Sequence, residues 1–153
     1  MTGKRDNLET VDTGGYAAMI SKQRGGGFLV EFPDLPGCLT EGATIEEALE
    51  EASEAMTGWL YAAIKAGEDL PASGNYPGGS YHLITPEIDV AVPLAIIRAR
   101  LANGMTQQQV ADAMGVSQQA YRKLEIPGKS NPTIRTLARL GEVLGIRLVM
   151  SNE

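Results

Sequence analysis

The residues best suited to contact another molecule lie together in the second half of the chain, from Ser117 to Lys123. Gln118 and Arg122 are four residues apart, and so are Gln119 and Lys123, so a helix through this segment presents each pair on one strip of its surface. Glutamine can form two hydrogen bonds with adenine, and arginine or lysine can bind O6 and N7 of guanine in the major groove. No acidic residue interrupts the segment. The pattern predicts a helix that reads bases in duplex DNA.

Four helices are expected to position that segment, because the chain has a helical pattern from Ala91 onwards. Pro93 suits the first turn of the first helix, where a backbone N–H would be unpaired in any case. Gly115 ends the second helix and Ser117 caps the third, a spacing typical of a helix-turn-helix. Residues 131–133 (Asn-Pro-Thr) lead into the fourth. The apolar residues expected to face inward are Leu94, Ile97, Leu101, Val110, Ala111, Met114, Ala120, Tyr121, Leu124, Ile134, Leu137, Ala138, Val143 and Leu144.

Residues 101–145 resemble the phage-repressor/Cro (XRE) family in helix lengths, the glycine turn, the Leu-Glu pair and the Asn-Pro-Thr entry to the last helix. That family sets an arginine late in its first helix against the glutamate that ends its third, which implies a structural pair of Arg100 and Glu125. Gln107 is expected to contact a phosphate at the start of the second helix, with help from the exposed amides there. The predicted DNA-binding residues are Gln107, Ser117, Gln118, Gln119, Arg122, Lys123, Lys129 and Asn131. A competing interpretation is that the helical unit only forms dimers or docks a protein.

The first half of the chain predicts a small sheet. Apolar stretches at 16–20 and 28–32 flank a glycine-rich turn, which is typical of a β-hairpin. Phe28, Val30 and Phe32 alternate, so they would share one face of the second strand. Two prolines and a glycine within 33–37 break that strand, and short strands are expected at 38–41 and 81–85.

One long amphipathic helix is predicted between the last two strands. Thr44 and Glu47 have the spacing of a capping box, in which the threonine binds an orphan amide and the glutamate reaches back to the cap. Gly67 ends the helix, and apolar residues recur at three- and four-residue steps from Ile45 to Ile64. The opposite face either is merely solvated or steers a basic partner, and it carries Glu46, Glu47, Glu50, Glu51 and Glu54.

Residues 27–48 (GFLVEFPDLPGCLTEGATIEEA) resemble the HicB antitoxin family, and the resemblance extends over residues 15–85. It implies a partial RNase H-like domain in which a small sheet packs on one helix. It also implies a partner, the HicA toxin, which is a small basic ribonuclease whose active-site histidine the antitoxin blocks. The residues expected at the toxin contact are Phe32, Asp34, Leu35 and Glu41. Many antitoxins of this family carry a C-terminal helix-turn-helix, so the two resemblances agree.

Charge separates the two halves of the chain. Residues 1–84 contain 5 basic and 13 acidic residues, a net charge of −8, whereas residues 85–153 contain 8 basic and 6 acidic residues, a net charge of +2. The first half therefore suits a basic protein, and the second suits nucleic-acid phosphates.

Catalysis is not expected. An RNase H site needs carboxylates that converge on Mg²⁺, and Glu31, Asp34 and Glu41 fall on separate strands and a turn with no evident clustering. His82 has no predicted catalytic partner, and Cys38 has neither a CxxC spacing nor a basic neighbour. We therefore predict no enzyme activity, no metal and no cofactor. Because no apolar run could span a bilayer and the start shows no export signal, a cytoplasmic location without membrane contact is expected.

The predicted architecture is α+β. It comprises a flexible arm (1–14), a partial RNase H-like β-β-β-α-β domain (15–85), a linker (86–92) and an all-α helix-turn-helix domain (93–153) with a terminal strand at 146–150. That strand either joins the sheet of the first domain or pairs with its copy across a two-fold axis. We expect the second arrangement, in a homodimer or larger homo-oligomer, because such repressors read two half-sites. The predicted function is an antitoxin that blocks a HicA-type mRNA-cleaving toxin and autoregulates its operon by binding operator DNA. The alternative is a stand-alone transcriptional regulator whose N-terminal domain senses a ligand or protein.

Overall fold

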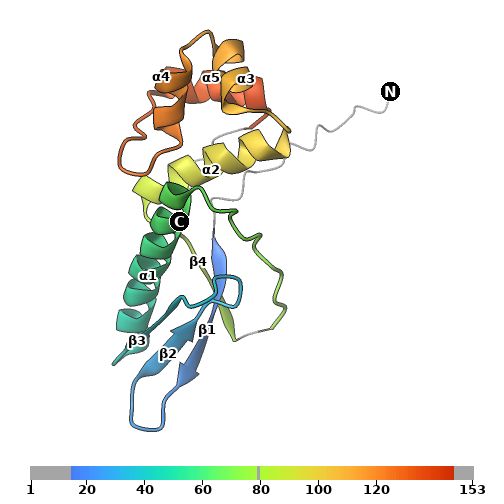
Figure 1. The fold of residues 1–153 in the computed structure, drawn as a ribbon. Coiled ribbons are helices and arrows are strands. Elements are labelled where there is room, and N and C mark those ends of the chain that lie inside the picture. Colours follow the sequence, from blue (N-terminus) through green and yellow to red (C-terminus); the bar gives the residue numbers. More distant parts are fainter. Residues whose placement is uncertain (1–14, 79, 147–153) are drawn as a thin grey trace.

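The structure is a computed structural model that describes residues 15–78 and 80–146, in which an antiparallel sheet and its covering helix precede a group of shorter helices (Figure 1). Four strands form the sheet in the order β3-β2-β1-β4. The strands are β1 (Tyr16–Lys22), β2 (Phe28–Glu31), β3 (Leu39–Gly42) and β4 (Tyr81–Ile84). The helices are α1 (Ile45–Ala66), α2 (Ile88–Ala102), α3 (Gln107–Met114), α4 (Gln118–Leu124) and α5 (Ile134–Leu144). The mixed α+β class and the β-β-β-α-β order predicted from the sequence are confirmed. The expected arm and nearly all of the expected terminal strand lie outside the described residues.

The β1–β2 hairpin forms as predicted, with Ile20 opposite Val30 and Lys22 opposite Phe28. Val30 and Phe32 are buried and Phe28 is half-buried, and all three belong to the cluster beneath α1. The alternation in this strand therefore identified the covered face correctly. The other face of the sheet is open to solvent, as shown by the exposed side chains of Leu39 and Leu83.

Helix α1 is closed at both ends by local hydrogen bonds. The Thr44 hydroxyl accepts from the Glu47 amide at 3.1 Å, and Gly67 adopts a left-handed conformation (φ 69°) that ends the helix. The Glu47 carboxylate accepts from the amide of Ala43 at 2.9 Å, one residue before the expected partner. The predicted bond to Thr44 is therefore wrong in this detail, because the chain before the cap turns its Ala43 N–H toward the carboxylate.

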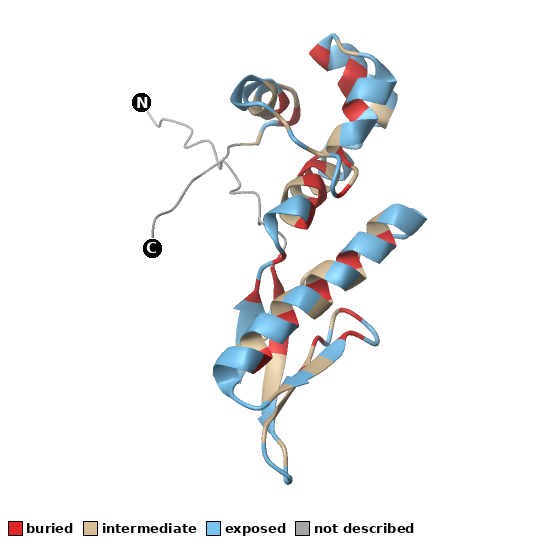
Figure 2. Cartoon of the chain, turned by 90° about the vertical axis from the view of Figure 1, so that its left-hand side faces the viewer, coloured by how far each residue is buried: buried red, intermediate tan, exposed pale blue. Residues whose placement is uncertain are grey.

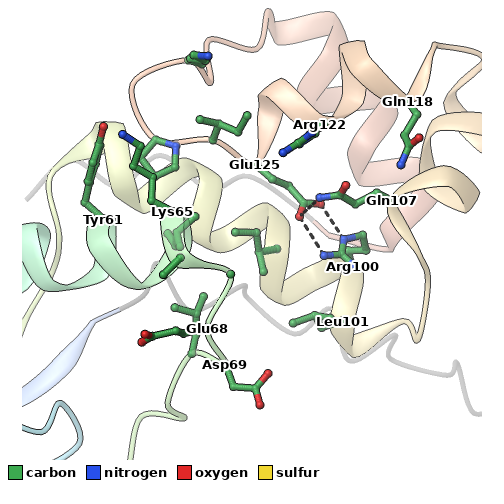
Figure 3. Close-up of a pocket in the computed structure, with 18 of the residues that line it drawn as sticks. Tyr61, Lys65, Glu68, Asp69, Arg100, Leu101, Gln107, Gln118, Arg122 and Glu125 are labelled. Atoms are coloured by element: carbon green, nitrogen blue, oxygen red, sulfur yellow. Dashed lines mark hydrogen bonds and ion pairs between the residues drawn. The ribbon is translucent and has the colours of Figure 1, made fainter.

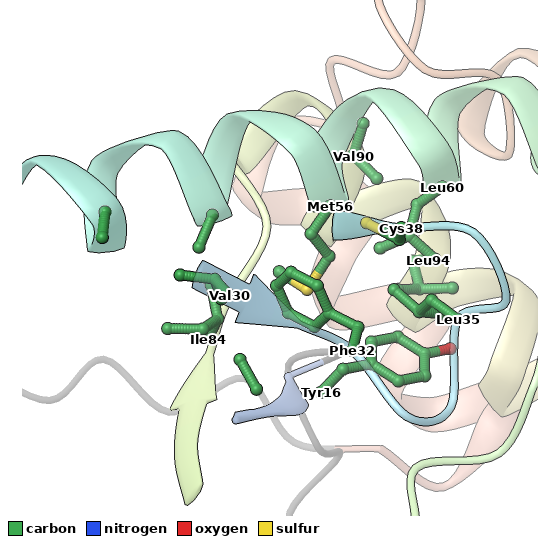
Figure 4. Packing of buried hydrophobic residues seen from close by; sticks show 13 residues of the cluster. Tyr16, Val30, Phe32, Leu35, Cys38, Met56, Leu60, Ile84, Val90 and Leu94 are labelled. Carbon is green, nitrogen blue, oxygen red and sulfur yellow. The ribbon is translucent and has the colours of Figure 1, made fainter. Parts of the chain in front are cut away.

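Two clusters of buried apolar side chains make up the core. The first lies between the sheet and α1 and includes Tyr16, Met56 and Leu60 (Figure 4). The second lies among the C-terminal helices and includes Val110, Tyr121 and Leu140. Figure 2 shows the buried positions as a stripe along α1 and as separate patches on the C-terminal helices.

Helix α2 contributes to both clusters. Val90 and Leu94 pack into the first cluster, and Ile96 and Ala99 into the second. The helix begins at Ile88, within the expected linker and five residues before the proline expected in its first turn. That prediction is wrong because burial of Val90 and Leu94 against the sheet favours extra helical turns. Pro93 removes only the hydrogen bond that the Asp89 carbonyl would have accepted.

The C-terminal helices lie where the sequence indicated, but they bury a narrower stripe. Leu101 and Ile134 are 59% and 86% exposed, and Ala120 and Ala138 are also exposed. These four were wrongly expected to face inward. Leu101 and Ile134 lie at the last and first turns of their helices, beyond the reach of the small cluster, and Ala120 and Ala138 lie beside the single stripe that each helix turns toward it.

Candidate nucleic-acid interface

Helices α3 and α4 form a helix-turn-helix whose ends are fixed by capping side chains. Thr106 and Gln109 make a complete capping box at the start of α3, with hydrogen bonds of 3.1 and 2.9 Å. Gly115 ends α3 with φ 69°, a conformation that glycine adopts without steric cost. The Ser117 hydroxyl then accepts from the Ala120 amide at 3.1 Å and starts α4. These local bonds set the direction in which α4 leaves the turn.

The Glu125 carboxylate anchors the end of α4 to two other helices. It accepts from Arg100 Nε at 2.7 Å and Nη2 at 3.0 Å, from Gln107 Nε2 at 3.2 Å, and from the Tyr121 hydroxyl. Arg100 also donates from Nη1 to the Met105 carbonyl at 3.0 Å. The structure thus brings together the Arg100–Glu125 pair that the family resemblance implied.

Within this hydrogen-bond network, the pKa values of Arg100 and Tyr121 are raised. The hydrogen bond to Glu125 raises the pKa of the Arg100 guanidinium, against the lowering effect of burial. Burial, followed by the hydrogen bond to Glu125, raises the pKa of the Tyr121 phenol far above its ordinary value. Both groups therefore keep their protons at neutral pH and act as donors that hold α4 in place.

The surface of α4 is open along the predicted reading face. Gln118, Gln119, Arg122 and Lys123 are all exposed. Tyr121 is fully buried on the opposite side of the helix. The structure therefore leaves four groups with base-compatible hydrogen-bonding chemistry at the surface of a short, firmly anchored helix.

The residues expected at phosphates lie around this helix. Lys129 and Asn131 are exposed in the loop after α4, and Ser117 is exposed at its cap. Gln107 is half-buried, and its amide donates to Glu125. One amide hydrogen of Gln107 remains for a phosphate, because the NH₂ group carries two donors.

Part of the reading face also lines a cleft of about 1170 Å³ between α4 and the end of α1. Gln118, Gln119 and Arg122 belong to one wall, and Tyr61 and Lys65 belong to the other (Figure 3). The segment after α1, with the carboxylates of Glu68 and Asp69, continues that second wall. This juxtaposition could not be predicted from the sequence, because neither helix carries a pattern that specifies the other.

The four residues expected at the toxin contact are divided by burial. Phe32 and Leu35 are 4% and 0% exposed and belong to the cluster beneath α1, so their side chains cannot meet a partner in this structure. The apolar residues of the distinctive loop instead fasten it to the sheet and to α1. Glu41 is exposed on β3, where it accepts from Gln23 Nε2 at 3.3 Å.

The Asp34 carboxylate is hydrogen-bonded to residues of its own chain. Its carboxylate accepts from the Gly74 amide at 2.8 Å and from the Tyr76 hydroxyl at 2.6 Å, and this hydrogen bond raises the pKa of the Tyr76 phenol. The Tyr76 ring in turn stacks on Tyr81 with centroids 4.8 Å apart. Asp34 therefore ties the loop after α1 to the loop after β2.

The described residues contain no group of three or more histidine, cysteine or carboxylate side chains placed to hold a metal ion. Across the same part of the chain, the helices are too short or too polar to cross a membrane. The lone thiol, Cys38, is buried, and burial raises its pKa.

Comparisons with known proteins match both halves. Residues 16–78 match the family described as HicB-like antitoxin of bacterial toxin-antitoxin systems, and residues 96–150 match a helix-turn-helix family. Antitoxin HicB 1 of Photorhabdus laumondii is 30% identical over 138 residues, which cover 90% of this chain and 86% of that protein. Antitoxin HicB of Escherichia coli K12 is 30% identical over 110 residues, or 71% and 78% of the two chains. The crystal structure of Burkholderia pseudomallei antitoxin HicB aligns with a TM-score of 0.43 and 24% identity, over 50% of this chain and 65% of that one. The chain belongs to the HicB antitoxin family and carries a helix-turn-helix in its C-terminal part.

Proposed function

We propose that the chain is an antitoxin that blocks a HicA-type mRNA-cleaving ribonuclease through its N-terminal part and represses its own operon through its C-terminal part. The observation that carries the DNA half is the exposed, acid-free face of α4, with Gln118, Gln119, Arg122 and Lys123 at its surface. In this proposal the four side chains contact base edges, whereas Gln107, Ser117, Lys129 and Asn131 contact the phosphate backbone. The chain then acts by binding in the cytoplasm and has no catalytic site of its own.

The acidic face of α1 supports the toxin half. Its five glutamates are exposed and point away from the sheet that the helix covers: Glu46, Glu47, Glu50, Glu51 and Glu54. A face of this kind attracts a basic, RNA-binding protein and competes with RNA phosphates for its cations. Glu41 is exposed on the neighbouring strand β3 and adds a carboxylate on the sheet face that α1 leaves open, since it alternates with Gly42, which faces α1. We therefore assign the toxin contact to α1 and β3, with Phe32, Leu35 and Asp34 shaping the loop beside them.

The organisation proposed with this function is a toxin-binding domain over residues 15–85 and a DNA-binding domain over residues 93–153. The partial RNase H-like character of the first domain and the pairing of residues 146–150 across a two-fold axis belong to the proposal. Pairing into a homodimer would suit operator binding, because two recognition helices at a fixed spacing read two half-sites of one operator.

Co-purification tests the toxin half. The expected partner is a small, basic, histidine-containing protein encoded next to this gene, and the two should co-elute when expressed together. Glu50→Lys/Glu54→Lys places two cations on the acidic face and should abolish co-elution through charge repulsion. Asp112→Lys/Glu142→Lys makes the same charge change on exposed carboxylates of α3 and α5 and should leave co-elution intact. Failure of the wild-type chain to retain any basic protein would favour a stand-alone regulator.

A further inference from the structure

The reading face of α4 and the end of α1 form opposite walls of one cleft in the same chain (Figure 3). Gln118 and Arg122 lie on one side, and Lys65, Glu68 and Asp69 lie on the other. A duplex on α4 must extend outward from this face, because its two phosphate backbones flank the helix that enters the major groove. It would therefore have to enter the space that the end of α1 borders.

The size of the cleft limits how much of a duplex can lie between its two walls. Its volume is about 1170 Å³. One base pair of B-DNA occupies roughly 1100 Å³, taken as a cylinder about 20 Å across and about 3.4 Å along the axis. Recognition helices commonly contact about three or more successive base pairs. The space between the two walls therefore cannot hold the DNA that α4 must meet, and the rest of the duplex would have to lie where the cleft opens to solvent.

The wall opposite α4 carries more negative than positive charge. Glu68 and Asp69 are exposed acids on that wall, and Lys65 is an exposed cation beside them. Phosphates that approached Arg122 would come close to these two carboxylates, and like charges in a confined cleft repel. Shape and charge thus agree that the cleft disfavours bound DNA.

Two features hold the cleft in this arrangement. Helix α2 is shared by both apolar clusters, so it links the sheet part directly to the helix-turn-helix part. In addition, Arg98 of α2 donates to the Tyr16 hydroxyl of β1 and, at 3.5 Å, to the Pro71 carbonyl. The Tyr16 hydroxyl itself donates to the Pro71 carbonyl at 2.6 Å, and the Arg98 guanidinium lies 5.2 Å from the Tyr16 ring centre. We call these contacts the Arg98 clasp.

We propose that the structure is a closed, DNA-excluding form in which the end of α1 occludes α4, and that duplex binding requires the two parts of the chain to separate. The inference rests on the DNA binding proposed above. When only an open fraction of molecules can bind, the apparent affinity is reduced by that fraction. Weakening the Arg98 clasp should therefore strengthen DNA binding, although Arg98→Ala removes a positive charge.

The test measures binding of the full chain to a fluorescein-labelled duplex of about 30 base pairs from upstream of the gene, long enough for two half-sites. Arg98→Ala and Tyr16→Phe should each lower the Kd by about three- to tenfold, the effect of losing one or two hydrogen bonds that favour the closed form. Tyr16→Phe keeps the buried ring and the net charge, so it serves if Arg98→Ala folds poorly. Arg24→Ala is the matched control. This exposed arginine lies in the β1–β2 turn, and that turn is at the end of the molecule remote from α4 (Figure 1). The substitution should not lower the Kd.

A distance measurement gives an independent readout. Spin labels on Tyr61→Cys at the end of α1 and on Glu142→Cys of α5 mark the two parts of the chain at exposed residues with no proposed DNA contact, and the buried thiol of Cys38 is shielded from the label. Adding the duplex should lengthen the distance between the labels. An unchanged distance in the bound complex, or an unchanged or raised Kd for both clasp variants, would overturn the proposed occlusion. If no variant and not the wild type bound the duplex, the DNA-binding proposal itself would fail.

Discussion

Glu125→Ala is expected to be among the most damaging single substitutions in the C-terminal part of the chain. One carboxylate, 4% exposed, accepts hydrogen bonds from Arg100, Gln107 and Tyr121. Removing one partner of a buried ion pair costs about 3–5 kcal/mol, because the other charge is left without compensation. The Arg100 side chain is 14% exposed and can recruit some water, so the lower part of that range applies. We expect Glu125→Ala to lower the free energy of unfolding by about 3–4 kcal/mol, or the Tm by about 10 °C.

Urea denaturation followed by circular dichroism measures this loss. Glu142→Ala, which removes an exposed carboxylate on α5, is the matched control and should stay within about 0.5 kcal/mol of the wild type. Adding Arg100→Met to Glu125→Ala should recover part of the stability, since the unpaired cation is the main cost and an apolar chain of similar length removes it. A loss below about 1 kcal/mol for Glu125→Ala, or no recovery in the double variant, would show that Glu125 does not compensate a buried charge.

Three further predictions concern other contacts. The folded chain raises the pKa of Tyr121 above its ordinary value of 10.0, so the stability from this protonated group is present below pH 10 and is lost as the pH rises further; between about pH 9 and 11, urea midpoints should fall more steeply for the wild type than for Tyr121→Phe. Gly42→Ala should destabilise the chain by about 2 kcal/mol or more in the same assay, because the added Cβ would lie 2.4 Å from a backbone nitrogen of α1. Gly25→Ala, with open space around its Cβ, should be close to neutral. Asp34→Ala frees the Tyr76 hydroxyl and should speed amide hydrogen exchange around residues 72–78; unchanged exchange there would contradict the tying role of Asp34.

Local patterns in the sequence were sufficient to predict most of the helices and strands. The capping residues Thr44 and Ser117 both start the helix that they were expected to start. Alternation in 28–32 identified the covered face of the sheet, and Gly115 marked the turn between α3 and α4. These features depend on neighbours within a few residues, and such neighbours can be read directly from the chain.

The wrong predictions concern residues that are buried by segments far away in the sequence. Pro93 looked like a helix start, but the sheet cluster draws Val90 and Leu94 into an earlier beginning of α2. Phe32 and Leu35 looked like a contact loop, yet the same residues fill the core beneath α1. Propensity and spacing carry no information about which long-range partner will bury an apolar side chain.

The cleft between α1 and α4 is the clearest case of this limit. Its walls come from segments about fifty residues apart, and no charge pattern in either segment specifies the other. The four-residue spacing of Gln118 and Arg122 was enough to predict that both side chains are exposed on one face of α4. Their neighbours across the cleft could be identified only from the structure.

DNA reading by α4 is tested by titrating the upstream duplex and a scrambled duplex of equal length with the protein, over a range of salt concentrations. The wild type should prefer the upstream duplex, and its affinity should fall steadily with added salt as phosphate contacts release counterions. Gln118→Ala and Arg122→Ala should each weaken binding to the upstream duplex by about 1–3 kcal/mol and reduce the preference, whereas Gln107→Ala should weaken binding to both duplexes alike. Equal losses on both duplexes for Gln118→Ala and Arg122→Ala, or no salt-sensitive affinity at all, would contradict the assignment of α4 as the helix that reads DNA.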